Sequence, residues 1–275
     1  MSFLEQIIDR AKNDVKTIVL PESTDIRTIK ATAMILEKGI ANVILIGNKD
    51  NILKLAGDLD ISKAQIADPE NYDKFDDFAY TFYELRKNKG VTIKQAHQIM
   101  KDPLYFGVMM VKKGFADGMV AGAINSTANT LRPALQILKT APGTKLVSSF
   151  FVMVVPDCQY GHNGTFVYAD CGLVENPNSE ELSEIAIASA KSFKDLVGAE
   201  PKVAMLSYST YGSAKSEFTE KVIKATMLAK EKAPQLCLDG ELQADAALVP
   251  EVGKSKAPDS KIAGEANVLI FPNLD

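Results

Sequence analysis

Residues 165–207, TFVYADCGLVENPNSEELSEIAIASAKSFKDLVGAEPKVAMLS, contain a complete strand–helix–strand unit. Short β-branched runs at Thr165–Ala169 and Lys202–Ser207 predict strands on either side of a helix over Ser179–Val197. Asn178 offers a polar N-cap, acidic residues fill the first helical turn, and a glycine follows the last turn. Two apolar strands joined through a helix predict parallel pairing in a sheet that helices cover.

The same alternation extends along the rest of the chain. Further strands are expected at Thr17–Leu20, Asn42–Ile46, Gly118–Ala121, Ser148–Val155 and Val268–Phe271, and further helices at Asp25–Lys38, Asp76–Lys89, Ile93–Lys113, Thr127–Leu138 and Ser216–Lys232. The polar stretch Val249–Ile262 is expected to be a loop. The pattern predicts an α/β fold with mostly parallel sheets covered on both faces. At 275 residues we expect two domains, 1–147 and 148–275.

Composition narrows the function. The net charge is −4 and no dense basic stretch is present, which argues against a nucleic-acid partner. Three cysteines without a CxxC pair fit a reducing compartment, and the acidic, amphipathic N-terminus is not a signal or transit peptide. The two histidines have no metal-binding spacing, so no metal site is expected. The sequence predicts a cytoplasmic protein.

The segment Gly122–Arg132 joins an expected strand to an expected helix through small polar residues. Backbone N–H groups and hydroxyls at a helix N-terminus suit an anion, and an arginine one turn later adds a planar fork for phosphate or carboxylate. The substrate-binding candidates here are Asn125, Ser126, Thr127, Thr130 and Arg132. The alternative is an ordinary capped helix with a solvated arginine.

A second loop, Ser207–Ser216, also follows an expected strand and opens a helix. Ligands of open α/β sheets bind at the carboxyl ends of strands, where this loop would lie. It has the spacing of neither a Walker A loop nor a GxGxxG dinucleotide fingerprint. Its substrate-binding candidates are Ser209, Thr210, Gly212 and Ser213, and the alternative is a flexible surface loop.

Three isolated residues are weaker candidates. Arg86 lies on an expected helix and would by default be a surface charge. Asp170 stands at the end of an apolar strand, where an acid can be a site residue or can cap the following turn. Cys158 would by default be a small buried hydrophobe. The residues alone indicate an α/β enzyme with an anion-binding cleft that acts on a phosphorylated or carboxylated small molecule.

Seven segments resemble those of phosphate acetyltransferases, in the family's order and along nearly the whole chain. They are TIVLPESTDIRTIKAT (17–32), FYELRKNKG (82–90), NSTANTLRPALQILKTAPG (125–143), SSFFVMVVPDCQYG (148–161), VYADCGLVENPNSEELSEIAIASAKSF (167–193), SYSTYGSAKSE (207–217) and LDGELQADAALVPEV (238–252). The resemblance implies two three-layer α/β/α domains like those of isocitrate and isopropylmalate dehydrogenases, an active site in the cleft between them, and a homodimer.

The resemblance also implies a reaction, the reversible transfer of an acetyl group between coenzyme A (CoA) and inorganic phosphate. It implies small-molecule partners (CoA, acetyl phosphate and phosphate), no membrane, and no metal, cofactor or prosthetic group. Arg86 and Arg132 correspond to arginines that bind CoA or phosphate. The two loops would line the cleft, with Cys158 and Asp170 near the site and Cys158 not an essential nucleophile.

Family members continue past the equivalent of Asp275 with an Asn-Asp-Leu-Ser-Arg-Gly motif and then an Asp. The resemblance therefore places the catalytic Ser, Arg and Asp beyond residue 275 and leaves the catalytic residues of this chain unknown. We expect the chain to be truncated, its first domain to lack the segment that completes it, and its activity to be absent or nearly so. The alternatives are a phosphate butyryltransferase-like enzyme for longer acyl chains and a non-catalytic protein that binds CoA or acetyl phosphate.

Overall fold

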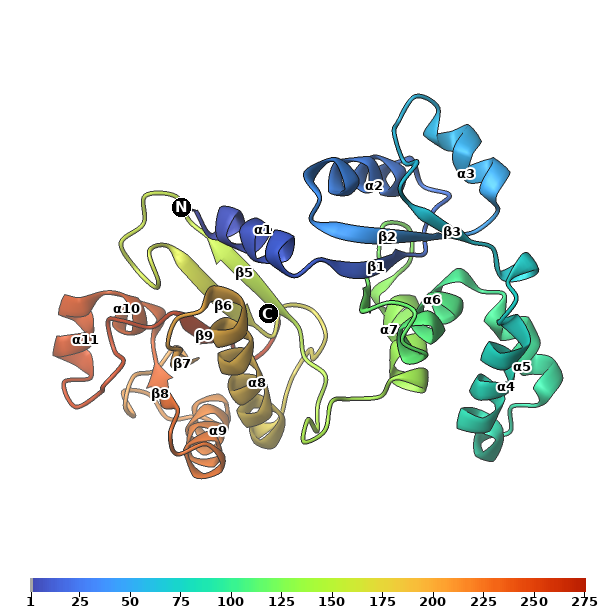
Figure 1. Ribbon diagram of the computed structural model, residues 1–275. Coiled ribbons are helices and arrows are strands. Elements are labelled where there is room, and N and C mark those ends of the chain that lie inside the picture. Colours follow the sequence, from blue (N-terminus) through green and yellow to red (C-terminus); the bar gives the residue numbers. More distant parts are fainter. Residues whose placement is uncertain (1) are drawn as a thin grey trace. The chain divides into compact units, whose positions relative to one another are not determined.

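The computed structural model describes residues 2–275, which form two compact α/β units (Figure 1). The first unit ends at Lys139 and the second is Thr140–Asp275, so the division lies before the junction expected after residue 147. The intervening segment belongs to the second unit because Leu146 packs against its core and the backbone of Ser149 donates to Asp170 over 2.8 Å.

The first unit is built on a four-stranded parallel sheet of order β3-β2-β1-β4. Its strands are β1 (Lys16–Leu20), β2 (Ala41–Ile46), β3 (Gln65–Ala67) and β4 (Gly118–Met119). Its helices are α1 (Phe3–Asn13), α2 (Ile26–Lys38), α3 (Lys49–Ala56), α4 (Phe75–Arg86), α5 (Ile93–Met100), α6 (Pro103–Lys112) and α7 (Thr127–Ile137), with short 3₁₀ turns at Pro69–Asn71 and Lys87–Lys89.

Alternating side chains of β1 and β2 bury both faces of this sheet. Val43 and Leu45 join a core with α2 and α3, whereas Ile44 and Ile46 join the core that contains α4, α5, α6 and α7. Successive side chains of a strand point to opposite faces, so a strand that is apolar at every position requires cover on both sides. The first unit therefore has the expected three-layer α/β/α arrangement.

The second unit contains a five-stranded sheet of order β5-β6-β9-β7-β8, which is parallel except for the antiparallel pair β5–β6. The strands are β5 (Phe150–Val154), β6 (Thr165–Ala169), β7 (Lys202–Leu206), β8 (Cys237–Leu242) and β9 (Val268–Ile270). The helices are α8 (Ser179–Val197), α9 (Glu217–Lys232), α10 (Ala244–Leu248) and α11 (Pro250–Lys256). One core lies between the sheet and α8 with α9, and another lies on the side of α10 and α11.

Two expectations about helices were wrong. The single helix expected over Ile93–Lys113 is two helices, because Asp102 accepts hydrogen bonds from the N–H groups of Leu104 and Tyr105 and Pro103 begins a new helix. The loop expected at Val249–Ile262 contains α11, which also begins at a proline, Pro250.

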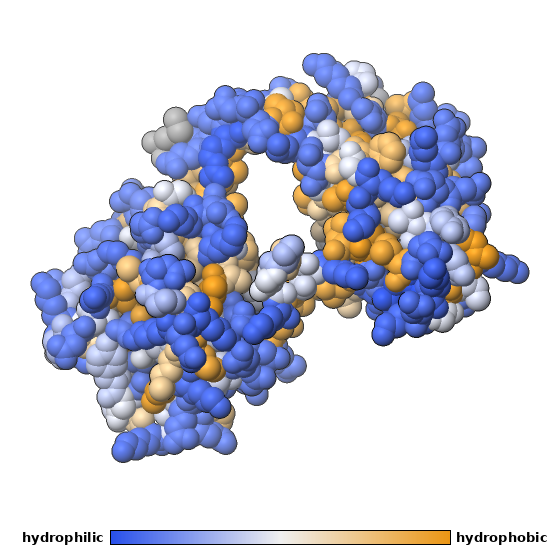
Figure 2. All heavy atoms as spheres, turned by 60° about the horizontal axis from the view of Figure 1, so that its bottom comes forward, coloured by the Kyte–Doolittle hydropathy of each residue, from blue (hydrophilic) through white to orange (hydrophobic). Residues whose placement is uncertain are grey.

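The surface in Figure 2 is largely hydrophilic, with apolar residues interspersed. Within residues 2–275, no helix combines the length and the apolar character needed to cross a membrane. The same residues contain no group of three or more His, Cys, Asp and Glu side chains placed to hold a metal ion.

Candidate functional site

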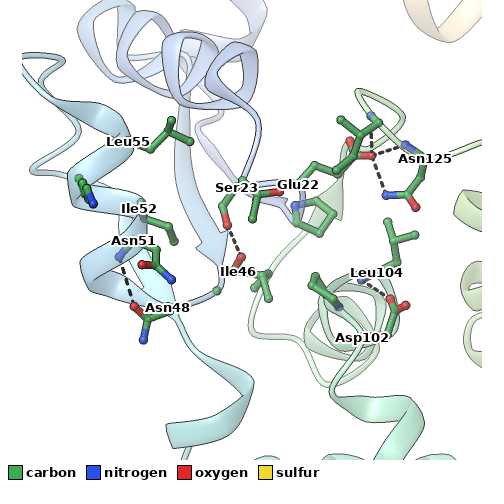
Figure 3. Close-up of a pocket in the computed structure, with 16 residues that line it drawn as sticks. Glu22, Ser23, Ile46, Asn48, Asn51, Ile52, Leu55, Asp102, Leu104 and Asn125 are labelled. Atoms are coloured by element: carbon green, nitrogen blue, oxygen red, sulfur yellow. Dashed lines mark hydrogen bonds between the residues drawn. The ribbon is translucent and has the colours of Figure 1, made fainter.

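A pocket of about 690 Å³ opens at the carboxyl ends of β1 and β2 in the first unit (Figure 3). This volume is in the range of small-molecule sites, and the carboxyl edge of a parallel sheet is where such folds bind ligands. Apolar side chains of α3 and the start of α6 form much of its wall, among them Ile52, Leu55 and Leu104. The polar residues that line it include Asn51 and Lys54 of α3.

A close approach between the ends of β1 and β2 shapes one wall of this pocket. Ser23 Oγ, which is buried, donates to the carbonyl oxygen of Ile46. Gly47 has φ of 141°, and a Cβ atom there would lie 2.9 Å from Ser23 Oγ. Glycine at position 47 therefore lets the two strand ends meet.

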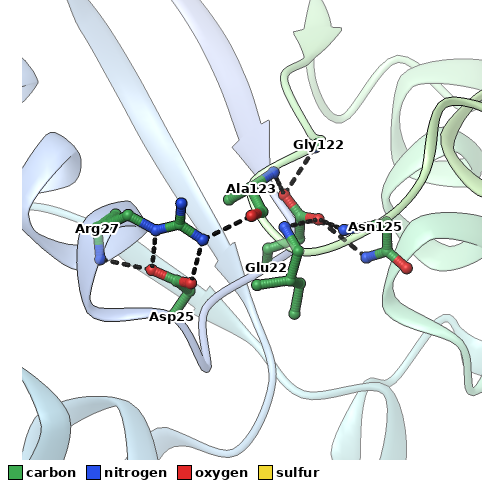
Figure 4. Close-up of polar contacts among 7 residues, drawn as sticks. Glu22, Asp25, Arg27, Gly122, Ala123 and Asn125 are labelled. Atoms are coloured by element: carbon green, nitrogen blue, oxygen red, sulfur yellow. Dashed lines mark hydrogen bonds and ion pairs between the residues drawn. The ribbon is translucent and has the colours of Figure 1, made fainter.

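The loop between β4 and α7, expected to bind an anion through its N–H groups, binds a carboxylate of the protein itself (Figure 4). Glu22 Oε2 accepts from the N–H groups of Gly122 and Ala123 over 2.8 and 2.7 Å. Glu22 Oε1 accepts from the N–H groups of Ile124 and Asn125 over 3.0 and 2.9 Å, and from Asn125 Nδ2 over 2.9 Å. These donors are therefore already occupied.

The environment of Glu22 keeps it ionised. Its side chain is buried, and burial alone would raise its pKa, but the hydrogen bonds from Ile124, Asn125 and Ala123 outweigh burial and lower the pKa to about 2. Arg27 also binds the β4–α7 loop, because its Nη2 donates to the carbonyl oxygen of Ala123 over 2.6 Å. The same nitrogen pairs with Asp25 over 2.7 Å.

The candidates that follow this loop lie at the start of α7. Ser126 caps the helix by accepting from the N–H of Asn129 over 3.3 Å, and Thr127 is the first helical residue. Ser126, Thr127 and Arg132 are exposed, and Asn125 lines the pocket. The expectation that small polar residues begin a helix here is confirmed.

The positive charges of Arg86 and Arg132 both act on Tyr105 of α6. Burial raises the pKa of Tyr105, and the positive charges of Arg132 and Arg86 act on it in the opposite direction. Among residues 2–275, no carboxylate forms an ion pair with either arginine. Tyr105 Oη donates to Gln136 Oε1 of α7 over 3.2 Å, and its ring packs on Phe82 of α4.

Two buried polar atoms in this region lack a hydrogen-bond partner, Arg86 Nε and Thr130 Oγ1. They are the unpaired buried side-chain atoms found within residues 2–275, and both belong to predicted substrate-binding residues. Buried polar atoms in native proteins are nearly always hydrogen-bonded, so an unpaired one indicates a missing partner. Unpaired positive charge and unpaired hydrogen-bonding atoms together favour an anionic ligand at this place.

In the second unit, the Ser207–Ser216 loop lies at the carboxyl end of β7 and is held by its own hydroxyls. Ser209 Oγ donates to Glu241 Oε1 over 2.9 Å and accepts from Ala214 N over 3.0 Å. Thr210 Oγ1 accepts from Gln243 N over 2.9 Å. Ser209 and Thr210 are buried, so their side chains fix the loop.

Glu241 and Asp239 hold the exposed end of this loop. Gly212 N donates to Glu241 Oε1 over 2.7 Å, and Tyr211 Oη donates to Asp239 Oδ2 over 2.5 Å. Burial and this bond raise the pKa of Tyr211 to about 12. Ser213 Oγ accepts from the N–H of Thr210 over 3.1 Å. This loop is thus held by hydrogen bonds of Ser209, Thr210, Ser213, Asp239 and Glu241.

Asp170 and Cys158 lie at opposite ends of β6. Asp170 follows the strand at its carboxyl end, is buried, and accepts from Ser149, Gly172 and Leu173 over 2.7–2.8 Å. Burial would raise its pKa, but these hydrogen bonds lower it. Cys158 lies in the hairpin that leads into the amino end of β6. Of the two, Asp170 shares the carboxyl edge with the Ser207–Ser216 loop.

Sequence reasoning missed Glu22 and Glu241 as site residues. A signal was present for Glu22, since an acid two residues after a buried strand points to the ligand edge of a parallel sheet. Glu241 lies in CLDGEL, whose polar residues hid the strand β8. The pocket residues of α3 had no signal, because neither α3 nor its contact with the strand ends was predicted.

The family model described as phosphate acetyl/butaryl transferase matches residues 2–275. A phosphate acetyltransferase of Acetivibrio thermocellus is 74% identical over 275 residues, which cover 100% of this chain and 83% of that relative. A phosphate acetyltransferase of Thermoanaerobacterium thermosaccharolyticum is 57% identical over 274 residues, covering 100% of this chain and 84% of that relative.

Solved structures agree in fold. A phosphotransacetylase from Streptococcus pyogenes matches with a TM-score of 0.92 at 41% identity, covering 100% of this chain and 83% of that one. A branched-chain phosphotransacylase from Enterococcus faecalis matches with a TM-score of 0.62 at 18% identity, covering 95% of this chain and 80% of that one, and shares the fold alone.

The low pKa of Glu22 predicts a specific acid sensitivity, tested with Glu22→Gln. A carboxyl whose pKa falls from 4.5 to about 2 on folding adds stability above pH 4.5 that is lost as pH falls through 2. The wild type should exceed the variant by roughly 3 kcal/mol in unfolding free energy near neutral pH, and the difference should vanish near pH 2. Urea denaturation at several pH values measures this. The exposed Glu37→Gln is the control, and a difference that does not change with pH would contradict the prediction.

Proposed function

Because the chain belongs to the phosphate acetyl/butaryl transferase family, we propose that Arg86, Arg132 and Thr130 bind anionic groups in its reaction. That reaction is the reversible transfer of an acetyl group between CoA and inorganic phosphate. One observation carries this proposal: Arg86 Nε and Thr130 Oγ1 are buried without partners, and no carboxylate of residues 2–275 forms an ion pair with Arg86 or Arg132. Phosphate and CoA both supply the oxygens that such donors bind.

The pocket at the ends of β1 and β2 is the proposed place for an apolar part of CoA. Its walls are mainly hydrophobic, and Asn51 and Lys54 contribute an amide and an ammonium group to the lining. The carboxylates that line it are engaged elsewhere, Glu22 with the β4–α7 loop and Asp102 with α6. CoA combines apolar stretches with phosphates, which suit the apolar walls and the lysine respectively.

The remaining site residues have proposed positioning roles. In the first unit, the Asn125–Thr127 turn is proposed to position a substrate for transfer. In the second unit, the loop with Ser209, Thr210, Gly212 and Ser213 is proposed by itself as a substrate-binding loop. The CoA thiol must lose its proton to attack the carbonyl of acetyl phosphate, and arginines would stabilise the developing negative charge. We propose that transfer proceeds without metal, cofactor or prosthetic group, in the cytoplasm. Cys158 and Asp170 are given no chemical step.

Removing either arginine should weaken substrate binding. Arg86→Gln and Arg132→Gln should each raise the dissociation constants of CoA and phosphate about tenfold or more, because each loses a charge-assisted hydrogen bond. Isothermal titration calorimetry measures this without requiring turnover. Lys89→Gln, which removes an exposed charge three residues after Arg86, should leave both constants unchanged. Affinities unaffected by both arginine variants would reject this site.

Turnover tests the activity itself. CoA-dependent acetyl transfer from acetyl phosphate is followed for the wild type and for Arg132→Gln, with Lys89→Gln as the control. We expect Arg132→Gln to be slower by about 10²–10³-fold, the cost of removing one donor that stabilises developing charge in a transition state. Equal rates for the wild type and Arg132→Gln would reject a role for this arginine in transfer.

A homodimer that pairs through β5 is proposed for the second unit. This strand is at the edge of its sheet and exposes Phe151, Met153 and Val154 by 56%, 37% and 45%. An apolar edge strand with unpaired backbone groups is a pairing surface, and the family resemblance makes a second copy its occupant.

Phe151→Glu should convert this dimer to a monomer, because it places a charge in an apolar contact. Sedimentation velocity measures the mass, with Tyr80→Glu as a control at an exposed aromatic residue of the first unit. A monomeric wild type, or a dimer unchanged by Phe151→Glu, would refute pairing through β5.

A further inference from the structure

Glu22 is a buried, charged residue whose two carboxylate oxygens are fully hydrogen-bonded within the protein. It therefore has no free oxygen with which to bind a substrate. Its side chain is 5% exposed, and its two oxygens accept five hydrogen bonds from residues about one hundred positions later in the chain. All five lie between 2.7 and 3.0 Å. The carboxylate thus fills the position that a bound anion would take in this loop.

The loop that Glu22 binds, Gly122–Asn125, leads from the pocket into helix α7. Ile124 and Asn125 line the pocket, and the next residue, Ser126, caps the helix that carries Thr130 and Arg132. Fixing four successive N–H groups on one carboxylate sets the direction in which α7 begins. A change in that direction would move Thr130 and Arg132 with it.

We infer that Glu22 is a positioning residue for acetyl transfer, an internal anion that shapes the Gly122–Asn125 loop and so places Asn125, Thr130 and Arg132. This inference rests on the proposed function. Glutamine cannot replace Glu22, because its single amide oxygen cannot serve four converging N–H groups and its NH₂ would face further donors. Alanine leaves the four N–H groups without a partner in a space that a small carboxylate can enter.

The experiment uses the full chain with Glu22→Gln and Glu22→Ala, and Asp117→Asn as the matched control. Asp117 accepts from the N–H of Thr17 over 2.8 Å at the opposite, amino end of β1, so Asp117→Asn neutralises a carboxylate that a backbone N–H binds far from the loop. Hydrogen exchange of the amides of residues 122–125 reports on the loop. Calorimetry reports the dissociation constants of CoA and phosphate, and formate is the added carboxylate.

Both Glu22 variants should show faster exchange at residues 122–125 and dissociation constants raised by about tenfold or more, the scale expected when binding groups are misplaced. Formate should slow this exchange and restore binding in Glu22→Ala, but not in the wild type or in Asp117→Asn. If Glu22→Ala does not fold, faster exchange and weaker binding in Glu22→Gln carry the same conclusion. Asp117→Asn should bind as the wild type does.

Three outcomes would overturn the inference. Unchanged exchange in the Glu22 variants would mean that the loop does not depend on the carboxylate. Faster exchange with unchanged dissociation constants would mean that Glu22 is structural only, and an equal loss in Asp117→Asn would mean general destabilisation. Failure of the proposed function has a different signature, since the wild type itself would then bind neither CoA nor phosphate.

Discussion

The carboxylate of Glu22 and the four N–H groups of residues 122–125 form the contact on which the first unit's site depends. A buried charge is costly unless hydrogen bonds satisfy it, and converging N–H groups are equally costly when left without an acceptor. Each side of this contact therefore requires the other. Since one side follows β1 and the other follows β4, the contact also ties together two strands that are neighbours in the sheet but distant in sequence.

In the second unit, too, buried carboxylates accept hydrogen bonds from N–H groups at the carboxyl edge of the sheet. Glu241 and Asp170 are buried at the carboxyl edge of its sheet. Glu241 accepts hydrogen bonds from the loop that follows the neighbouring strand β7, and Asp170 accepts from the loop that follows its own strand β6. Parallel strands leave all their following loops at one edge, and short loops there expose more N–H groups than they can satisfy themselves. Buried carboxylates at that edge meet this demand in both units.

Much of this architecture could be predicted from the sequence. The strands Thr165–Ala169 and Lys202–Leu206 and the helix Ser179–Val197 were predicted closely because apolar period, cap and terminal glycine all agreed. The break at Pro103 was missed because a long helical period outweighed the Asp-Pro start signal. β8 was missed because Asp239 and Glu241 interrupt its apolar pattern, and their partners come from the tertiary fold.

Some residues of the candidate site were predicted from the sequence and others were not. Arg86, Thr130 and Arg132 were predicted as binding residues, and they prove to carry unpaired atoms or unpaired charge. The role of Glu22 could not be predicted, because its partners lie about one hundred residues away and local pattern contains no information on that pairing. The pocket depends on side chains from α3 and α6 that meet only in the folded unit.

The saturated loops have a consequence for the thermodynamics of binding. Backbone order in the Gly122–Asn125 and Ser207–Ser216 loops is established during folding, so its entropic cost of roughly 1–2 kcal/mol per residue does not recur when a ligand arrives. Ligand affinity is then not reduced by the conformational entropy lost when a loop becomes ordered. The enthalpy and entropy of association should reflect mainly desolvation and ligand contacts. The hydrogen bonds that fix these two loops are made within the protein and require no ligand.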